Sequence, residues 1–321
     1  MEKEKKIIPI FLATDDNYAK YLAVALKSII VNANKKDYLY KIYILETDLD
    51  RKYLSSFEEI VGNAGTVEYV NVKEEIRLFQ SRLTLRDYYT YTTYYRIFIS
   101  EMFKEYDKAL YLDCDIVVNG DISKFYNFNI GNNLVGAIQE EVMFINEDFI
   151  RYAPLNLGVP TLKYFNAGVL VMNLKEFRRQ DIYTKFINLI MEKQFPVAQD
   201  QDYLNVLCKG KVRYLPYSWN KTPINVGIIC SNKPNLVHYK LTFKPWKYDN
   251  IQYGEYFYKY AKQTPFYEEI VNAKNNYSEA QKELDRVHSK HLHNLIIEQN
   301  TKALLMMGDE DGRIFENAAR I

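Results

Sequence analysis

The chain has 321 residues, of which 48% are hydrophobic and 26% charged, values typical of a globular protein rather than a disordered or collagen-like one. Lysine and arginine number 42 against 41 acidic residues, so the chain lacks the basic excess of most nucleic-acid-binding proteins. Its three cysteines, Cys114, Cys208 and Cys230, are far apart and odd in number, which excludes a disulfide scaffold and a four-cysteine zinc site.

The first half of the chain alternates strand-like and helix-like patterns. Apolar runs predict strands at 7–13, 40–45, 66–70 and 109–112, and helical spacing predicts helices at 19–30, 54–61 and 92–102. This alternation predicts an α/β fold with a mostly parallel sheet and crossover helices. Ligands of such sheets bind at the carboxyl ends of the strands, where the polar clusters 14–17 and 113–115 lie.

The second half is more mixed and ends in a polar segment. Strands are predicted at 134–138, 169–172 and 212–215, and helices at 175–192 and 199–208. Residues 251–321 look helical, so we expect a catalytic domain at 1–250 and a C-terminal helical extension at 251–321. The chain contains neither GxGxxG nor GxxxxGK[ST], the motifs of the standard dinucleotide and P-loop phosphate sites.

The sharpest local feature is the run LYLDCDIVV at 110–118, in which two carboxylates stand one residue apart among apolar residues. Residues i and i+2 of an extended chain point the same way, so Asp113 and Asp115 are predicted to face one ligand. Two anions so close repel each other unless a cation lies between them. A divalent ion such as Mg²⁺ or Mn²⁺, with diphosphate oxygens completing its shell, is the natural partner. The alternative is a strand-end turn with two solvated acids.

Other candidate functional side chains each have a structural alternative. His238, the only histidine before residue 288, is a candidate metal ligand, although a lone histidine is more often structural. Asp200 and Gln201 stand at the start of a predicted helix and either cap it or lie beside a reacting group. Asn166 either binds a hydroxylated substrate or belongs to an Asn-Ala-Gly turn. Lys244 either neutralises phosphate or is a solvated surface charge.

Several segments together resemble glycosyltransferase family 8, which includes bacterial lipopolysaccharide galactosyl- and glucosyltransferases and glycogenin. In chain order they are LATDDNY (12–18), YYRIFI (94–99), LYLDCDIVV (110–118), YFNAGVLVMN (164–173), QDQDYLN (199–205) and HYKLTFKPW (238–246). The resemblance covers roughly residues 7–247. It implies a GT-A fold, which is a Rossmann-like α/β arrangement around a mostly parallel mixed sheet, a UDP-sugar donor, a divalent metal that is usually Mn²⁺, and retention of the anomeric configuration.

Carried over position by position, the resemblance implies a role for each matched residue. The uridine site would comprise Ala13, Asp15, Asn17 and Tyr18, with Tyr18 stacked on the uracil. The metal ligands would be Asp113, Asp115 and His238, and Lys244 would bind the diphosphate. The donor sugar would contact Arg96, Asn166, Asp200 and Gln201, of which Asp200 and Gln201 are the candidate catalytic residues. The expected donor site also includes Cys114, Glu140 and Ala167.

Two positions depart from the family pattern. Leu241 stands where the family normally has a glycine, so the loop must move or an N–H contact with the phosphates is lost. Glu140 stands where the family usually has an aspartate and reaches one methylene further. Either change is expected to alter sugar preference or hydroxyl contacts, and neither removes a metal ligand.

The resemblance implies a retaining hexosyltransferase that moves galactose or glucose from a UDP-sugar to a hydroxyl of a glycan, glycolipid or glycoprotein. Attack on the same face is favoured over a covalent intermediate, because the amide oxygen of Gln201 is a poor nucleophile. Gln201 and Asp200 would then stabilise the oxocarbenium-like charge. The rival interpretations are a metal-dependent nucleotide-sugar hydrolase and a catalytically degenerate protein that binds nucleotide or glycan.

The predicted location and partners follow from the two ends of the chain. The apolar run IIPIFLA after MEKEKK is too short for a signal peptide, and no stretch reaches the roughly 18–20 apolar residues of a membrane helix. Residues 251–321 carry nine basic and eleven acidic residues, so attraction to an anionic membrane should be weak. We expect a cytoplasmic protein with free thiols, and leave open peripheral membrane attachment and a homo-oligomer formed through the extension. Seven aromatic side chains are predicted to pack against the catalytic domain or a second copy: Tyr253, Tyr256, Phe257, Tyr258, Tyr260, Phe266 and Tyr267.

Overall fold

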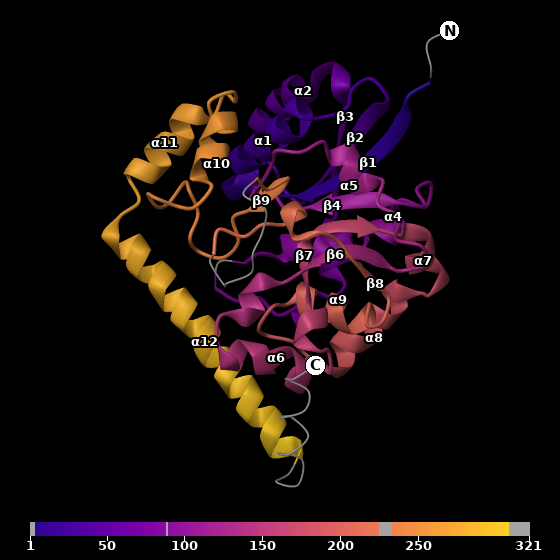
Figure 1. Ribbon diagram of the computed structural model, residues 1–321, viewed down its shortest axis with the longest axis vertical. Coiled ribbons are helices and arrows are strands. Elements are labelled where there is room, and N and C mark those ends of the chain that lie inside the picture. Colours follow the sequence, from indigo (N-terminus) through magenta and orange to yellow (C-terminus); the bar gives the residue numbers. More distant parts are fainter. Residues whose placement is uncertain (1–3, 88, 225–232, 308–321) are drawn as a thin grey trace.

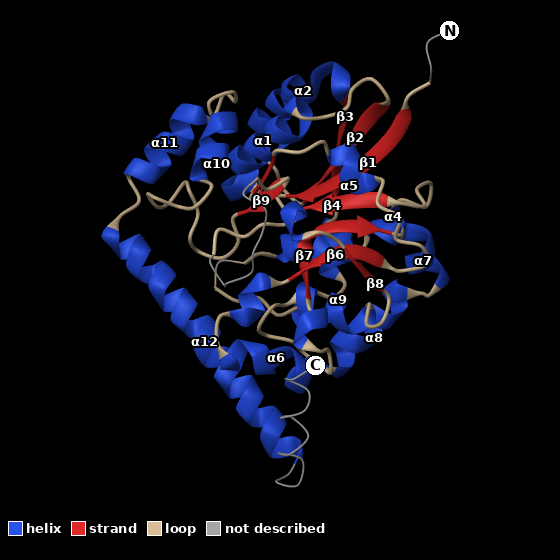
Figure 2. Cartoon of the chain, viewed as in Figure 1, coloured by secondary structure: helices blue, strands red, loops and turns tan. Residues whose placement is uncertain are grey.

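The computed structural model describes residues 4–87, 89–224 and 233–307. Cys230 and residues 308–321 of the predicted extension lie outside these ranges. Helices lie on both sides of a central sheet, and a long C-terminal helix runs along one edge of the molecule (Figures 1 and 2).

The central sheet has seven strands in the order β3-β2-β1-β4-β7-β6-β8. Their bounds are Lys6–Ala13 (β1), Tyr38–Glu46 (β2), Gly65–Asn71 (β3), Ala109–Leu112 (β4), Val135–Gln139 (β6), Phe165–Met172 (β7) and Val212–Tyr214 (β8). The neighbours from β3 to β4 are parallel, and β7 runs antiparallel to both β4 and β6. The predicted mostly parallel mixed sheet is therefore confirmed.

Alternate side chains of β1 enter two different hydrophobic clusters, one on each face of the sheet. Ile8, Ile10 and Leu12 pack with helices α1 and α2, whereas Phe11 and Ala13 pack in the cluster that includes α4, α7, α8 and α9. The helices have the bounds Asp16–Val31 (α1), Leu54–Val61 (α2), Lys73–Arg77 (α3), Ile99–Met102 (α4), Ile122–Tyr126 (α5), Glu147–Leu157 (α6), Leu174–Arg179 (α7), Ile182–Glu192 (α8) and Asp200–Leu207 (α9). Burial on both faces explains why β1 reads as a continuous apolar run.

Two predicted helices differ from the structure. The single helix predicted at 175–192 is wrong: it divides into α7 and α8 because Asp181 adopts a left-handed conformation, with φ 51°, and accepts the Thr184 N–H as the cap of α8. The helix predicted at 92–102 is a 3₁₀ segment, Tyr91–Ile97, followed by the short α4. Four successive residues of that segment, 94–97, are buried, so it has no solvent-facing side.

A second, two-stranded sheet brings distant parts of the sequence together. β5 (Ile116–Val118) pairs with β9 (Leu236–His238) in antiparallel register, which places Ile116 opposite His238. β5 follows β4 after a short bend, so His238 is brought beside the residues at the carboxyl end of β4. This pairing assembles the site described below.

The C-terminal segment forms three helices, α10 (Gly254–Ala261), α11 (Tyr267–Asn275) and α12 (Glu279–Met307), and the predicted helical C-terminal region is confirmed. The ring of Phe257 lies 6.4 Å from that of Tyr21 in α1, and the ring of Phe266 lies 5.5 Å from that of Tyr53. These contacts confirm that aromatic side chains early in the segment pack against the rest of the chain. The division at residue 250 stays a prediction.

Helix α12 follows α11, runs along one edge of the molecule and packs against α6 (yellow in Figure 1). Among the residues that the structure describes, no helix combines the length and apolar character needed to cross a membrane.

Candidate active site

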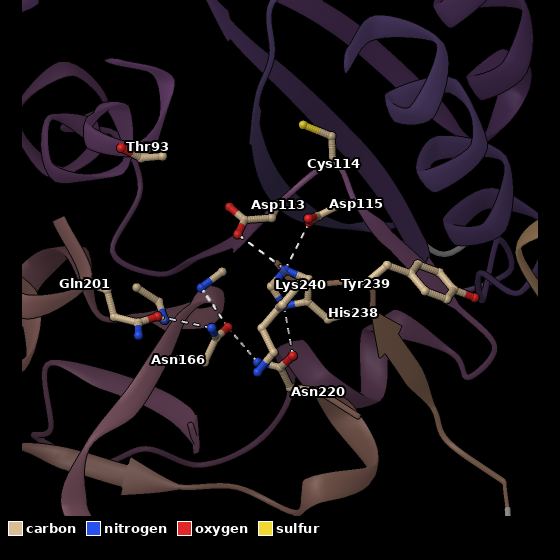
Figure 3. A network of polar contacts seen from close by, with 12 residues as sticks. Thr93, Asp113, Cys114, Asp115, Asn166, Gln201, Asn220, His238, Tyr239 and Lys240 are labelled. Carbon is tan, nitrogen blue, oxygen red and sulfur yellow. Dashed lines mark hydrogen bonds and ion pairs between the residues drawn. The ribbon is translucent and has the colours of Figure 1, made fainter. Parts of the chain in front are cut away.

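Two carboxylates and an imidazole meet where β4 ends. Asp113 and Asp115 lie in the bend between β4 and β5, at the carboxyl end of the strand predicted at 109–112, and β9 brings His238 opposite them. The Nε2 atom of His238 lies 3.5 Å from Asp113 Oδ2 and 3.0 Å from Asp115 Oδ1 (Figure 3). One ligand atom from each residue lies within 4.8 Å of the others, close enough for all three to converge on one ion.

The backbone of β7 passes directly against these side chains at Gly168. A Cβ atom at this position would lie 2.2 Å from Asp113 Oδ2 and 2.5 Å from His238 Cε1, closer than such atoms approach. The Gly168 carbonyl also accepts the backbone N–H of Asp113 at 2.8 Å. The Asn-Ala-Gly segment is thus part of a strand rather than a turn, and its glycine leaves the space in which the three side chains meet.

Asn220 holds the imidazole in one orientation. Its Oδ1 lies 3.0 Å from His238 Nδ1, and its Nδ2 donates to Asn166 Oδ1 at 2.8 Å. Because an amide oxygen can only accept, the proton of the neutral imidazole lies on Nδ1 and the lone pair of Nε2 faces the two carboxylates. That tautomer, with two carboxylates beside it, suits a divalent cation, so the residues present fit the metal that the resemblance implies.

Two cations flank the acids. Lys244 Nζ lies 2.6 Å from Asp115 Oδ2, and a terminal guanidinium nitrogen of Arg96 lies 3.2 Å from Asp113 Oδ1. Burial by itself would raise the pKa of Asp115, but the ammonium of Lys244 beside it is the largest opposing effect, and the pKa lies well below its usual value. Asp115 is therefore ionised at neutral pH and available to a cation.

Arg96 links this cluster to a third carboxylate, Asp200, in the first turn of α9. The Nε of Arg96 lies 3.0 Å from Asp200 Oδ2, and the guanidinium lies 4.2 Å from the centre of the Tyr111 ring. Burial raises the pKa of Asp200 to about 7, against the lowering effect of Arg96 and with a further rise from the charge of Asp113. Asp200 thus changes its charge near neutral pH. Its ion pair with Arg96 is a contact that capping of α9 alone would not require.

The side chains of Gln201 and Asn166 are fixed by hydrogen bonds. Gln201 Oε1 accepts from the Ala167 N–H at 3.0 Å and from Asn166 Nδ2 at 3.1 Å, while Gln201 Nε2 donates to the Tyr164 hydroxyl at 3.1 Å. Asn166 Nδ2 also donates to Glu140 Oε2 at 2.6 Å. These contacts join α9 to β7 and hold both amides at the cavity surface (Figure 3).

The two positions that depart from the family pattern, Glu140 and Leu241, both adjoin Lys240, which is buried. Lys240 Nζ donates to Glu140 Oε1 at 2.6 Å, and the two residues are 8% and 4% exposed. Burial opposes ionisation of Glu140, but the ammonium of Lys240 lowers its pKa below the usual value. Leu241 has φ 60°, the left-handed conformation that glycine adopts most easily. The backbone of this loop therefore has a conformation that suits glycine, although the residue there is leucine.

The remaining predicted residues lie around the start of α1. Asp15 caps this helix by accepting the Tyr18 N–H at 3.1 Å, and its other oxygen lies 3.4 Å from the Thr90 hydroxyl. Lys244 Nζ lies 5.8 Å from the centre of the Tyr18 ring. Cys114 donates its thiol proton to the Ala13 carbonyl at 2.7 Å, and burial raises the thiol pKa well above its usual value.

One cavity of about 460 Å³ is lined by every residue that the sequence placed in the site, Asn17 and Ala167 included. Its wall also contains an apolar group made of Val142, Met143, Phe149, Leu241, Leu292 and Ile296. Sequence reasoning missed Asn220, which stands in no recognised pattern, and Leu292 and Ile296 of α12. It also gave no role to Lys240, although Lys240 lies inside the recognised motif 238–246. Gly168 lay inside a recognised motif, but only the packing of β7 reveals its role.

Comparison with known proteins places these residues in a family. Residues 9–250 match the model of glycosyl transferase family 8. A putative glycosyltransferase of Haemophilus influenzae is 31% identical over 235 residues, which are 72% of this chain and 68% of that protein. A lipopolysaccharide 1,2-glucosyltransferase of Escherichia coli K12 is 31% identical over 186 residues, or 52% of this chain and 53% of that one.

A solved structure is similar over most of the described fold. The crystal structure of the galactosyltransferase LgtC in complex with donor and acceptor sugar analogues has a TM-score of 0.67 and 26% identity, covering 80% of this chain and 96% of that chain. The fold predicted from the sequence, a GT-A arrangement with a helical C-terminal region, is confirmed.

Proposed function

This chain belongs to glycosyl transferase family 8, and from that premise we propose that it transfers galactose or glucose from a UDP-sugar to an acceptor hydroxyl, with retention of the anomeric configuration. The observation that carries the proposal is the convergence of Asp113, Asp115 and His238 in one cavity with Lys244 and Arg96. Two acids, an imidazole and two buried cations suit a metal-bound diphosphate better than a neutral ligand.

In this proposal the diphosphate lies at the acidic cluster and the uracil on Tyr18. Asp113, Asp115 and His238 hold a divalent cation, Mn²⁺ or Mg²⁺, which when bound supplies a Lewis acid for the departing diphosphate. Lys244, which is 2% exposed, adds a fixed positive charge at the same end. Asp15 and Asn17, at the start of α1, contact the nucleoside.

At the sugar end, Asp200 and Gln201 stabilise the positive charge that develops on the sugar ring. The Oε1 of Gln201 already accepts two hydrogen bonds, which fix its dipole and make it a weak candidate for a covalent nucleophile. Asp200 carries a negative charge above about pH 7. These contacts support attack by the acceptor on the face that UDP leaves. Arg96, Asn166 and Glu140 position the donor sugar.

The acceptor is proposed to be a glycan, a glycolipid or a glycoprotein at the cytoplasmic side of the cell. The similar E. coli protein is a lipopolysaccharide 1,2-glucosyltransferase, and the similar LgtC structure contains donor and acceptor sugar analogues. Both sugars, glucose and galactose, stay in the proposal because Glu140 and Leu241 depart from the family pattern, and either change is expected to alter sugar preference.

An array of acceptor glycans, offered UDP-galactose and UDP-glucose separately with Mn²⁺, tests the proposal. We expect transfer from one donor at a rate far above its hydrolysis, UDP affinity that rises when Mn²⁺ is added, and loss of transfer in EDTA. Consumption of the donor without transfer to any acceptor would instead support a nucleotide-sugar hydrolase. UDP binding without consumption of either donor would support a degenerate binding protein.

A further inference from the structure

We propose that helix α12 is part of the active site, and that Leu292 closes the acceptor end of the cavity, where it keeps water from the transferred sugar and limits the size of the acceptor. This inference rests on the proposed transferase function. It assigns to the C-terminal segment a role in specificity that lies outside residues 9–250, the part that matches the family model.

The position of α12 in the cavity wall is the first observation. Leu292 and Ile296 stand one helical turn apart and line the same cavity as Asp113 and His238. They belong to one hydrophobic cluster with Val142, Met143 and Phe149, and Leu241 packs against it. Leu292 is 9% exposed and Ile296 1%, so both side chains are buried where they line the cavity, and Leu292 is the more accessible of the two.

The attachment of α12 on one side of the cavity is the second observation. Asp285, near the start of the helix, accepts from Lys247 Nζ at 3.0 Å and from the Tyr248 hydroxyl at 3.0 Å. One turn later, the hydroxyl of Ser289 lies 3.3 Å from that of Thr242. These contacts tie the helix to the segment that carries Lys240, Leu241 and Lys244.

On the other side, α12 is held by α6 and by a loop. His293 Nε2 lies 2.9 Å from Asp148 Oδ2, and Asn300 Nδ2 donates to the Asp148 carbonyl at 2.8 Å. His291 Nδ1 lies 2.7 Å from Asp87 Oδ1, next to Arg86, which also lines the cavity. The helix is therefore fixed at both ends of the stretch that carries Leu292 and Ile296.

The chemistry of this wall explains its function. An aliphatic side chain gives water no hydrogen bond, so a wall of such side chains disfavours ordered water beside the sugar. Water competes with the acceptor: when it attacks, the bond from the anomeric carbon to the diphosphate oxygen breaks, a bond to the water oxygen forms, and free hexose, UDP and a proton are released. Leu292 lowers this loss and leaves room only for an acceptor that fits against it.

Donor hydrolysis without acceptor is the direct test. Leu292→Ala opens the wall, and we expect release of UDP from the donor, with Mn²⁺ present, to rise about tenfold while UDP affinity stays within about twofold of the unchanged protein. Leu292→Met conserves volume and is expected to hydrolyse donor like the unchanged protein. Ile297→Ala is the matched control, because Ile297 lies on the same helix and is 42% exposed.

Leu292→Trp tests the limit on acceptor size and does not create a cavity that threatens folding. We expect it to reduce kcat/KM for acceptors of two or three hexose units about tenfold more than for a monosaccharide glycoside, again with unchanged UDP affinity. Equal hydrolysis in all Leu292 variants together with equal acceptor preference would overturn the proposal. A change in UDP affinity as large as the change in hydrolysis would also overturn it, because α12 would then only stabilise the fold.

Failure of this inference is distinguishable from failure of the proposed function. UDP binding with Mn²⁺ and transfer to the acceptor array are measured first on the unchanged protein. If neither occurs, the proposed function fails. If transfer is normal but the Leu292 variants have unchanged donor hydrolysis and acceptor preference, only the role of α12 is contradicted.

Discussion

The two ends of the cavity are built in different ways. The proposed donor end consists of charged side chains within hydrogen-bonding distance of one another, such as Asp115 and Lys244 at 2.6 Å. Another part of the wall is aliphatic and aromatic and comes partly from α12, which contributes Leu292 and Ile296. An ion pair forms only between particular charged groups at a particular distance, whereas an apolar wall depends mainly on the volume of its side chains. The donor end should therefore tolerate substitution far less than the apolar wall does.

Removal of a metal ligand is the largest expected effect and the strongest test of this difference. Asp113→Ala, Asp115→Ala and His238→Ala should each lower the rate of sugar transfer by about 10²–10³-fold, since the diphosphate loses the group that stabilises its charge. The rates are to be measured at saturating donor and Mn²⁺. Glu74→Ala, at an exposed carboxylate, is the control and should keep full activity. Full turnover in excess EDTA would show that the metal assignment is wrong.

The next largest expected effect is the change in the free energy of unfolding with pH that the ionisation of Asp200 causes. The pKa of Asp200 is raised to about 7 in the folded state, so the unfolded chain loses this proton at lower pH than the folded chain does. The stability that its protonated form contributes is present below about pH 4 and is lost as the pH rises through about 7.

This predicts that, in metal-free protein, the free energy of unfolding falls by a few kcal/mol between about pH 5 and pH 8 relative to that of Asp200→Asn. Denaturant unfolding of both proteins at each pH measures the difference. Asp107→Asn, at an exposed acid, is the control substitution. Parallel pH profiles for the Asp200 variant and the unchanged protein would contradict the prediction.

Gly168→Ala tests whether the charged end depends on space as well as on charge. The added methyl group would meet the carboxylate of Asp113 and the ring of His238, so we expect metal affinity to fall about 10–100-fold, as when a supporting residue of a metal site is changed. Titration with Mn²⁺ measures the loss. Gly254→Ala is the matched control, since its nearest neighbour would be Pro245 Cβ at 3.6 Å. Equal metal affinity in both variants would show that Asp113 simply moves aside.

The smallest expected effect lies at Leu241, where the charged end meets the apolar wall. Leu241→Gly and Leu241→Ala both remove the side chain, but only glycine relieves the left-handed backbone at φ 60°. The glycine variant should therefore be more stable than the alanine variant by about 1 kcal/mol. Thermal or denaturant unfolding of the two variants gives this difference directly. An alanine variant as stable as the glycine variant would mean that the loop relaxes out of this conformation.

Much of the sheet was predictable because its strands are apolar runs of the right length. The strand predicted at 7–13 is observed at Lys6–Ala13, and the one predicted at 40–45 at Tyr38–Glu46. The single helix predicted at 175–192 failed because nothing in its apolar spacing signals that Asp181 adopts a positive φ and starts a new helix. Aspartate is a common residue in any sequence, so its presence does not mark a helix start. Whether it caps a helix depends on its backbone conformation, which the surrounding packing decides.

The sequence by itself singled out the residues of the charged end and supplied the resemblance from which their roles are proposed, because each role needs a particular chemical group at a particular spacing. It could not determine that Asn220 orients His238, that Lys240 pairs with Glu140, or that Leu292 reaches the cavity. These contacts join segments far apart in the chain, and an asparagine, a lysine or a leucine has many other common uses. Only tertiary packing, above all the contacts of Asp285 and His293 that fix α12 across the site, decided which of those uses applies.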